Sequence, residues 1–291
     1  MRWEGNRESS NVEDDRGGGG GGGGFGFGGG AIGIGTIVIA LVGGALFGIN
    51  PLTILQLLSG GGAPHQVQQA PAHKPPADDR TAKFVSTVLA DTEDVWKQVF
   101  AQGGAQYREP KLVLFTGAVR TGCGAGQSAM GPFYCPADEK VYIDLDFYRT
   151  LRERLGAPGE FAQAYVIAHE VGHHVQKLLG TSARVEQARA RGNQAEGNAM
   201  SVRLELQADC YAGVWAHYSQ QGKGWLDPGD IESAMNAAQK IGDDTLQRSA
   251  GRAVVPESFT HGSSAQRQRW FNTGWQSGSV KQCDTFRAAS L

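Results

Sequence analysis

The sequence has no excess of positive charge, since 27 Lys and Arg residues stand against 29 Asp and Glu residues, for a formal net charge of −2. Proteins that bind a nucleic-acid backbone usually show a basic excess, so a nucleic-acid partner is not expected, and neither is a nucleotide. The chain also lacks a C-x-x-C pair, which argues against a zinc site built from cysteines. An apolar fraction of 40% excludes a wholly disordered chain. The 291 residues therefore predict one sizeable domain with appendages.

Glycine is the residue in excess, at 43 residues, and it dominates the segment 17–30, which only Phe25 and Phe27 interrupt. Residues 1–16 before it carry mixed charge and few apolar side chains. Such a composition offers nothing to bury in a core. We therefore expect residues 1–30 to form a disordered, Gly-rich tail.

An uncharged, apolar segment follows, AIGIGTIVIALVGGALFGI over residues 31–49, and its apolar character continues past Asn50 and Pro51 to Leu58. At a helical rise of about 1.5 Å per residue, residues 31–49 span roughly 28 Å, close to the hydrocarbon thickness of a bilayer. The pattern favours one transmembrane helix in residues 31–58, in contact with lipid. A buried globular helix would usually show a polar stripe, and a cleavable signal peptide would start nearer the N-terminus; these are the alternatives.

Positive charge predicts the orientation of this helix. Arg2, Arg7 and Arg16 precede it, and no Lys or Arg follows it until Lys74. Positive residues flank the cytoplasmic end of a spanning helix. We therefore expect the tail in the cytoplasm, a linker over residues 59–77, and a domain over residues 78–291 outside the cytoplasm.

All four cysteines lie after the apolar segment, on the side where disulfides form: Cys123, Cys135, Cys210 and Cys283. Four cysteines permit three pairings, among which spacing alone does not choose. We favour Cys123 with Cys135, because Gly and Pro surround both and the loop between them is short. Cys210 and Cys283 would then link distant parts of the chain. Four free thiols are the alternative.

The spacing of apolar residues predicts an α+β domain that is mainly helical, with a small β-sheet. Helices are expected over Asp78–Phe100, Phe147–Leu155, Phe161–Leu179 and Asn198–Ser219, with two more opening at Asp227–Pro228 and Ser263–Ser264. Strands are expected at Lys111–Phe115 and Lys140–Asp144, with a loop at Gly117–Cys135. From its position, Tyr142–Asp144 could form an edge strand that pairs with an extended substrate.

The helix predicted at Phe161–Leu179 contains His169, Glu170 and His173 in the pattern H-E-x-x-H. Positions i and i+4 lie on one face of a helix, so the two imidazoles can bind one metal ion. Glu170 lies one residue further round and can reach a water on that metal. A core helix with two satisfied histidines is the alternative, but burying these side chains without a partner would be costly.

A catalytic zinc ion needs a third protein ligand and an open position. The helix predicted at Asn198–Ser219 offers Glu205 and Asp209, four residues apart beside its apolar stripe. We assign Glu205 as the ligand because its longer side chain reaches a neighbouring helix. Asp209 then accepts a hydrogen bond from the non-ligating N–H of a zinc histidine. The reverse assignment and a solvated acidic edge are the alternatives.

These blocks, HEVGHHVQ and LELQADCYAGVW, resemble the putative neutral zinc metallopeptidase family of single-span, membrane-anchored bacterial proteins. TGCG, GPFYCP and SFTHGSS are also similar to blocks of that family, and the resemblance covers essentially the whole chain. It implies a zincin-like domain in the periplasm, anchored in the bacterial inner membrane. More remotely, Glu205-x-x-Ala208-Asp209 is similar to the ExxAD element of CAAX-protease and HtpX-like metallopeptidases, where the glutamate is the third zinc ligand. Arg203 stands two residues before this glutamate, not three as in those proteins.

Together these features predict an endopeptidase that binds one Zn²⁺ per chain through His169, His173 and Glu205 and cleaves proteins or peptides. Glu170 would act as general base on a zinc-activated water. His261, in a Gly/Ser loop, is the candidate to stabilise the oxyanion, with local packing as the alternative. His174 points away from His173 and is expected to be structural. A catalytically idle zinc-stabilised scaffold, or a metallohydrolase of non-peptide amides such as cell-wall crosslinks, are the alternative functions.

Overall fold

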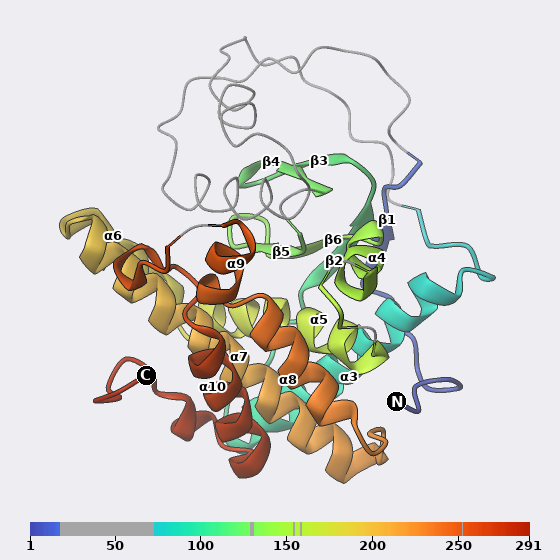
Figure 1. Ribbon diagram of the computed structural model, residues 1–291. Helices are drawn as coiled ribbons and strands as arrows, with labels where there is room; N and C mark the ends of the chain where they lie inside the picture. The colour runs from blue at the N-terminus through green and yellow to red at the C-terminus, as the bar shows by residue number, and fades with distance from the viewer. Residues whose placement is uncertain (18–72, 129–130, 154, 158, 252) are drawn as a thin grey trace.

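The computed structural model describes residues 1–17 and 73–291, except residues 129–130, 154, 158 and 252 (Figure 1). This part of the chain is mainly helical with a small sheet, an α+β fold as the sequence predicts. The predicted membrane segment, residues 31–58, lies outside the described residues. Among the residues that are described, no helix is long and apolar enough to cross a bilayer.

A four-stranded sheet lies on one side of the domain, in the order β1-β2-β6-β5. Its strands are β1 (Val12–Asp14), β2 (Lys111–Phe115), β6 (Lys140–Asp144) and β5 (Phe133–Cys135). β2 is parallel to both β1 and β6, whereas β5 is antiparallel to β6. β2 and β6 occupy their predicted ranges. The expectation of an edge strand at Tyr142–Asp144 is wrong, because β6 has a neighbour on each side and β5 forms that edge.

The segment predicted as a loop, Gly117–Cys135, instead contains β5 and a hairpin of β3 (Ala118–Thr121) and β4 (Gly124–Gln127). Their short sequences, AVRT and GAGQ, lack the alternation of apolar and polar residues that marks a strand. A disulfide between Cys123 and Cys135 joins the hairpin turn to β5. The hairpin is therefore tied to the edge strand of the main sheet.

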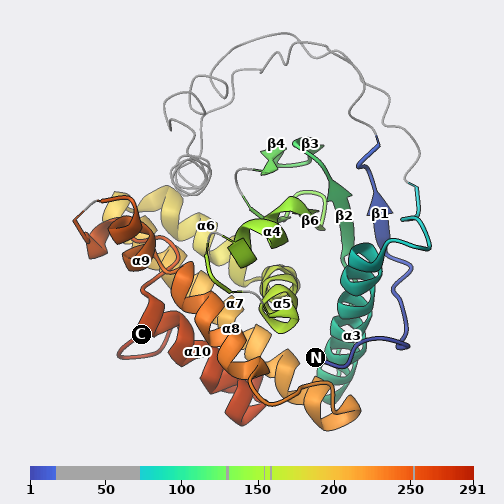
Figure 2. The ribbon, with the colours of Figure 1, turned by 45° about the vertical axis from the view of Figure 1, so that its right-hand side comes forward.

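Eight helices and two short 3₁₀ turns are described. They are α3 (Arg80–Gln102), α4 (Asp146–Glu153), α5 (Glu160–Leu178), α6 (Thr181–Arg191), α7 (Gln194–Lys223), α8 (Asp230–Lys240), α9 (Asp243–Ser249), α10 (Ser264–Ser277), η2 (Pro256–Ser258) and η3 (Val280–Cys283). Figure 2 shows α5 in the centre, with α3 and the sheet on one side and α7, α8 and α10 on the other. The central helix is therefore the one that contains the H-E-x-x-H pattern.

Helix α7 is longer than predicted, because it is capped outside the predicted range. Asn193 and Glu196 form a capping box at its start, and Gly224 ends it in the left-handed conformation, at φ 60°. Helix α10 packs very closely on α7. A Cβ atom at Gly274 would lie 1.9 Å from the carbonyl oxygen of Cys210, so only glycine fits there.

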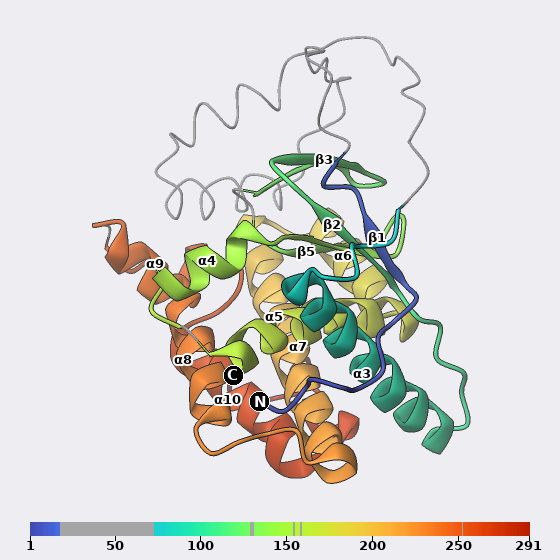
Figure 3. The ribbon, with the colours of Figure 1, turned by 90° about the vertical axis from the view of Figure 1, so that its right-hand side faces the viewer.

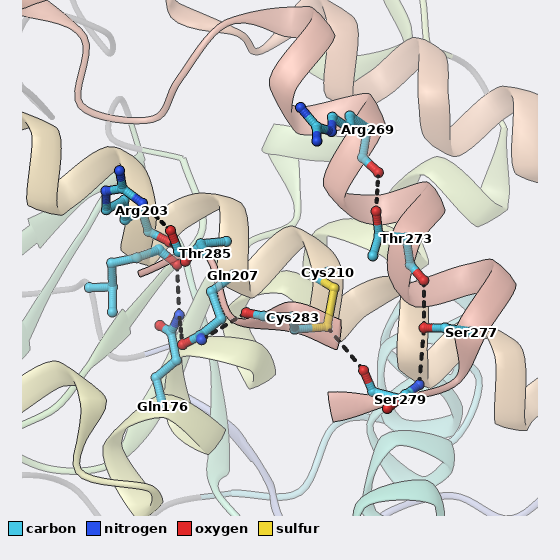
Figure 4. The surroundings of a disulfide bond; sticks show 11 residues. Gln176, Arg203, Gln207, Cys210, Arg269, Thr273, Ser277, Ser279, Cys283 and Thr285 are labelled. Atoms are coloured by element: carbon cyan, nitrogen blue, oxygen red, sulfur yellow. Dashed lines mark hydrogen bonds between the residues drawn. A yellow bond between two sulfur atoms is a disulfide. The ribbon is translucent and has the colours of Figure 1, made fainter. Parts of the chain in front are cut away.

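A second disulfide joins Cys210 of α7 to Cys283 of η3 (Figure 4). Both disulfides thus follow the pairing favoured from the sequence. Beside this bond, Gln207 donates a hydrogen bond to the Cys283 carbonyl at 2.9 Å. Arg203 donates to the carbonyl of Thr285, so its side chain binds the C-terminal tail to α7. The C-terminal tail is therefore fixed to α7 by a disulfide and by several hydrogen bonds, one of them from the Thr285 hydroxyl to the Arg203 carbonyl at 2.6 Å.

The N-terminal segment, residues 1–17, is ordered and belongs to the domain, which corrects the predicted disordered tail for these residues. Figure 3 shows it running along α3 and entering the sheet as β1. Trp3 and Val12 are buried in the core. The rest of the predicted tail, residues 18–30, lies outside the described residues. A three-residue strand, whose partner β2 starts about a hundred residues later, leaves no local pattern to recognise.

Candidate metal centre

The candidate site forms where α5 and α7 pack together. Within the H-E-x-x-H pattern of α5, Gly172, the residue before His173, faces Ala208 of α7. A Cβ atom at Gly172 would lie 3.1 Å from the Ala208 carbonyl oxygen and 3.2 Å from its Cα. This glycine therefore allows the two helix backbones to approach closely, which brings α7 within reach of the α5 imidazoles.

His169 and His173 of α5 converge with Glu205 of α7, and their potential ligand atoms all lie within 4.8 Å of one another. The Oε2 atom of Glu205 is 3.1 Å from the Nε2 atom of His169 and 3.5 Å from the Nε2 atom of His173. Ligand atoms of a tetrahedral zinc site, with bonds of about 2.0–2.1 Å, lie about 3.3 Å apart. The donor set and its spacing thus fit zinc.

The Nδ1 atom of each imidazole, which faces away from Glu205, contacts a side-chain oxygen. The Nδ1 atom of His169 lies 2.9 Å from Asp209, and the Nδ1 atom of His173 lies 2.9 Å from the amide oxygen of Gln176. Because these oxygens accept hydrogen bonds from Nδ1–H, each Nε2 atom keeps a lone pair that can bind a metal ion held between the imidazoles and Glu205. Gln176 in turn donates to the Leu204 carbonyl of α7 at 2.6 Å.

Asp209 sits at the centre of a fully buried polar network. Arg267 of α10 donates to both its carboxylate oxygens, at 2.8 and 2.9 Å, and the Tyr165 hydroxyl donates at 2.5 Å. The side chains of Arg267 and Asp209 are 3% and 0% exposed. Burial raises the pKa of Asp209, but Arg267 and His169 outweigh that effect and hold it at about 2. Asp209 is therefore an anion fixed against His169.

The carboxylates around the two imidazoles favour positive charge on their rings. Burial alone would lower the pKa of His169, but Asp209 and Glu205 raise it to about 10. Burial would also lower the pKa of His173, and Glu205 raises it. An environment that stabilises a proton on these nitrogens equally attracts a cation bound between them.

Glu170 lines the same cavity, and none of the described residues donates a hydrogen bond to its carboxylate. Burial raises the pKa of Glu170, an effect that His169 and His173 oppose only in part. A raised pKa suits a carboxylate that takes up and releases a proton near neutral pH.

His261 lies in the loop before α10 and also lines the cavity. Its backbone N–H donates to Asp243 at 2.7 Å, and its Nδ1 atom is 3.1 Å from the Thr260 hydroxyl. These contacts fix the loop and orient the ring through Nδ1. His174, by contrast, is buried on the other side of α5, where it contacts the Tyr134 hydroxyl at 3.0 Å and the Arg108 carbonyl at 2.6 Å.

The cavity at the site has a volume of about 230 Å³. Apart from the residues already described, its walls are mostly apolar or aromatic, and include Pro132, Phe133, Phe147, Val166, Ile241 and Leu246. Edge strand β5 contributes Phe133 and Tyr134 to the wall. Within the described residues, the edge strand of the sheet therefore contributes to the wall beside the candidate ligands.

The sequence pattern missed Arg267, Gln176 and Tyr165. Arg267 was readable as one residue of a helix face that also holds Trp270, Phe271 and Gly274. A charge at the i position of such an i, i+3, i+4, i+7 face signals a buried ion pair. Gln176 and Tyr165 leave no comparable signal, because their roles depend on how α5 meets α7 and α10.

The family model described as "Putative neutral zinc metallopeptidase" matches residues 1–286. The chain belongs to this family. The uncharacterized protein YpfJ of Escherichia coli K12 is 54% identical over 290 residues, which cover 98% of this chain and 99% of YpfJ. The uncharacterized protein Rv2575 of Mycobacterium tuberculosis H37Rv is 47% identical over 207 residues, 68% of each chain. No solved structure matches the chain significantly. Membership in this family implies zinc as the metal and a protein or peptide as the substrate.

Proposed function

We propose that this family member is a zinc-dependent endopeptidase with a zincin-like domain and one catalytic zinc ion per chain. The observation that carries the proposal is the convergence of the two imidazole Nε2 atoms with Glu205, beside Glu170, whose carboxylate accepts no hydrogen bond from the described residues. His169, His173 and Glu205 would bind the ion and leave one position open. Bound zinc would supply a Lewis acid that acidifies water and polarises a peptide carbonyl.

Glu170 is the general base in this proposal. It takes a proton from the attacking water and passes it to the leaving amine. Its position on the cavity wall and its raised pKa support both transfers. Asp209 and Gln176 are positioning residues, since they fix the two imidazoles through Nδ1.

His261 is the proposed donor to the oxyanion that forms on the substrate carbonyl. Burial would lower its pKa, but Glu205 and Asp243 raise it, which favours a ring that carries a proton. With Nδ1 directed at Thr260, the other ring nitrogen is the one available to the cavity.

The substrate is proposed to bind as an extended strand along β5. This strand is the edge of the described sheet, and Phe133 and Tyr134 of β5 line the cavity, which supports pairing of its backbone with a peptide. The disulfide at Cys135 ties the end of β5 to the β3–β4 hairpin and keeps this edge in place.

We further propose that residues 31–58 attach the protein to the bacterial inner membrane, with the domain on the periplasmic side. The uncharged apolar composition of that segment supports attachment. Two disulfides in the domain support an oxidising compartment.

The test uses the full chain in detergent and its Glu170→Gln variant, with Glu186→Gln on the exposed face of α6 as matched control. Bound zinc is measured by elemental analysis and activity by cleavage of unfolded casein. We expect one zinc in all three proteins, and cleavage reduced at least about 1,000-fold only in Glu170→Gln. Equal cleavage in Glu170→Gln would refute its role. One zinc with no cleavage in any protein, also on a panel of folded and peptide substrates, would favour the scaffold function.

A further inference from the structure

The N-terminal segment is joined to the domain by backbone hydrogen bonds. β1 pairs with β2 in parallel register, so that Val12 stands opposite Leu112 and Asp14 opposite Leu114. The Leu112 N–H donates to the Asn11 carbonyl at 2.9 Å, and the Asp15 N–H donates to the Leu114 carbonyl at 2.8 Å. Strand pairing of this kind requires both strands to lie within one folded unit.

A buried carboxylate on α3 takes all its described partners from the N-terminal segment. Glu93 is 1% exposed and accepts hydrogen bonds from Ser9 at 2.5 Å, Asn11 at 2.9 Å and Arg7 at 2.9 Å. A buried carboxylate without partners is strongly unfavourable, so the folded domain needs the N-terminal segment in place to satisfy Glu93.

Trp3 attaches the start of the segment to helix α5, which holds the H-E-x-x-H pattern. Its side chain is 5% exposed and packs edge-on against Phe84 of α3. Its indole N–H donates to Glu160, the first residue of α5, at 3.0 Å. The segment thus runs from the start of α5, along α3, to the edge of the sheet (Figure 3).

The three arginines that suggest a cytoplasmic N-terminus are all engaged with this domain. Arg2 forms an ion pair with Asp227 at 3.1 Å, Arg7 with Glu93, and Arg16 with Asp79 at 2.6 Å. These ion pairs explain why the three arginines are present. Their positive charge is therefore no longer evidence for the side of the membrane on which the segment lies.

We propose that residues 1–17 and 73–291 lie on the same side of the membrane, as one domain closed by β1. A segment whose backbone and buried side chains pair with the domain cannot stand across a bilayer from it. This inference rests on the proposed membrane attachment. It replaces the expectation of a single crossing with a cytoplasmic N-terminus, because one crossing between residues 17 and 73 would separate β1 from β2.

The experiment places one cysteine at a time in the full chain. All four native cysteines are paired in disulfides, so an added cysteine is the only free thiol. Ser10→Cys probes the exposed part of the N-terminal segment, and Ser249→Cys probes the exposed end of α9. Spheroplasts that express each variant are treated with a membrane-impermeant maleimide, and labelling is normalised to that of the same cells after lysis and denaturation.

We expect the normalised labelling of the two variants to agree within about twofold and to be high in intact spheroplasts. Labelling of Ser249→Cys in intact cells, with Ser10→Cys labelled only after lysis, would overturn the proposal. If both were labelled only after lysis, the shared side would stand but the periplasmic location would fall. Recovery of the protein in the soluble fraction would refute membrane attachment instead. Asp15→Cys, at a second exposed position, guards against a local effect at residue 10.

Discussion

The α5–α7 pair and the N-terminal segment are both built around a buried carboxylate that an arginine from a distant part of the chain contacts. In the metal centre, Asp209 is paired with Arg267, whose side chain is 3% exposed. In the N-terminal region, Glu93 is paired with Arg7, whose side chain is 46% exposed. One ion pair is sealed from water and contacts His169, a proposed metal ligand, whereas the other lies at the surface and joins the N-terminal segment to α3.

This difference sets what each pair does. An arginine sealed from water cannot be replaced by solvent, so its loss leaves a buried anion exposed to a low dielectric medium. Water can reach Arg7 and can partly replace it. We therefore expect the Asp209 network to determine the geometry of the zinc site, and the Glu93 network to determine only how firmly the N-terminal segment is attached.

The largest effect is expected from Arg267→Met. Loss of the guanidinium should lower the free energy of unfolding by about 3–5 kcal/mol and weaken zinc binding, because Asp209 loses its main partner and no longer orients His169. Arg7→Met should lower it by about 1 kcal/mol and leave zinc affinity unchanged. Thermal unfolding and zinc titration of the full chain in detergent measure both. Arg269→Met, on the exposed face of α10, is the control, and equal losses in all three variants would contradict the distinction.

The next effect tests the N-terminal segment alone. Trp3→Ala should lower the free energy of unfolding by about 3 kcal/mol, because a nearly buried indole leaves the packing around Phe84. Zinc content should stay at that of the wild type, since Trp3 contacts α5 only at its first residue, Glu160, and does not belong to the described lining of the cavity. Arg2→Ala, whose side chain is exposed, serves as control. An unchanged melting temperature in Trp3→Ala would mean that this segment is not docked in solution.

A smaller effect tests the close approach of the two helices. Gly172→Val adds a side chain where a Cβ atom alone would lie 3.1 Å from the Ala208 carbonyl oxygen, so α7 must move away from α5. We expect zinc affinity to fall about tenfold, or about 1.4 kcal/mol, as Glu205 is drawn back from the imidazoles. Gly197→Val is the matched control, because the nearest atom at Gly197 is an arginine Cγ at 3.7 Å. Wild-type zinc affinity in Gly172→Val would show that the contact is not needed.

The smallest effect concerns pH and the N-terminal segment. Burial raises the pKa of Glu13, but Lys111 and Lys140 outweigh it and lower the pKa below its usual value of 4.5. A lowered folded-state pKa means that the ion pairs contribute stability above that usual value and lose it as the pH falls below it. Glu13→Gln should therefore cost about 1 kcal/mol or less at pH 7 and less than that at pH 3. Urea unfolding of both proteins at the two pH values measures this, and a pH-independent difference would contradict it.

The sequence predicted the parts of the site that depend on local spacing. The i, i+4 repeat of His169 and His173 is a property of one helix, and so is the placement of Glu205 and Asp209 on α7. Strands β2 and β6 were likewise readable from short apolar runs. The roles of these residues in catalysis stay predictions until they are tested.

Features that depend on contacts between distant segments were not readable. β1 has three residues, and the β3–β4 hairpin is made of small side chains, so neither shows a periodic pattern. The polar composition of residues 1–16 looked disordered because the partner of each charge lies in the domain. The apolar face around Arg267 indicates a buried ion pair, but only the fold identifies Asp209 as its partner.

The central claim is that α5 and α7 together form one zinc site, and X-ray absorption at the zinc edge of the full chain tests it most directly. The account predicts one zinc per chain, with a first shell of only nitrogen and oxygen at about 2.0–2.2 Å that includes two imidazoles. In Glu205→Ala the zinc content should fall, and the imidazole contribution should weaken in Asp209→Ala. Sulfur at about 2.3 Å, or a full zinc complement with unchanged first shell in Glu205→Ala, would contradict the assignment.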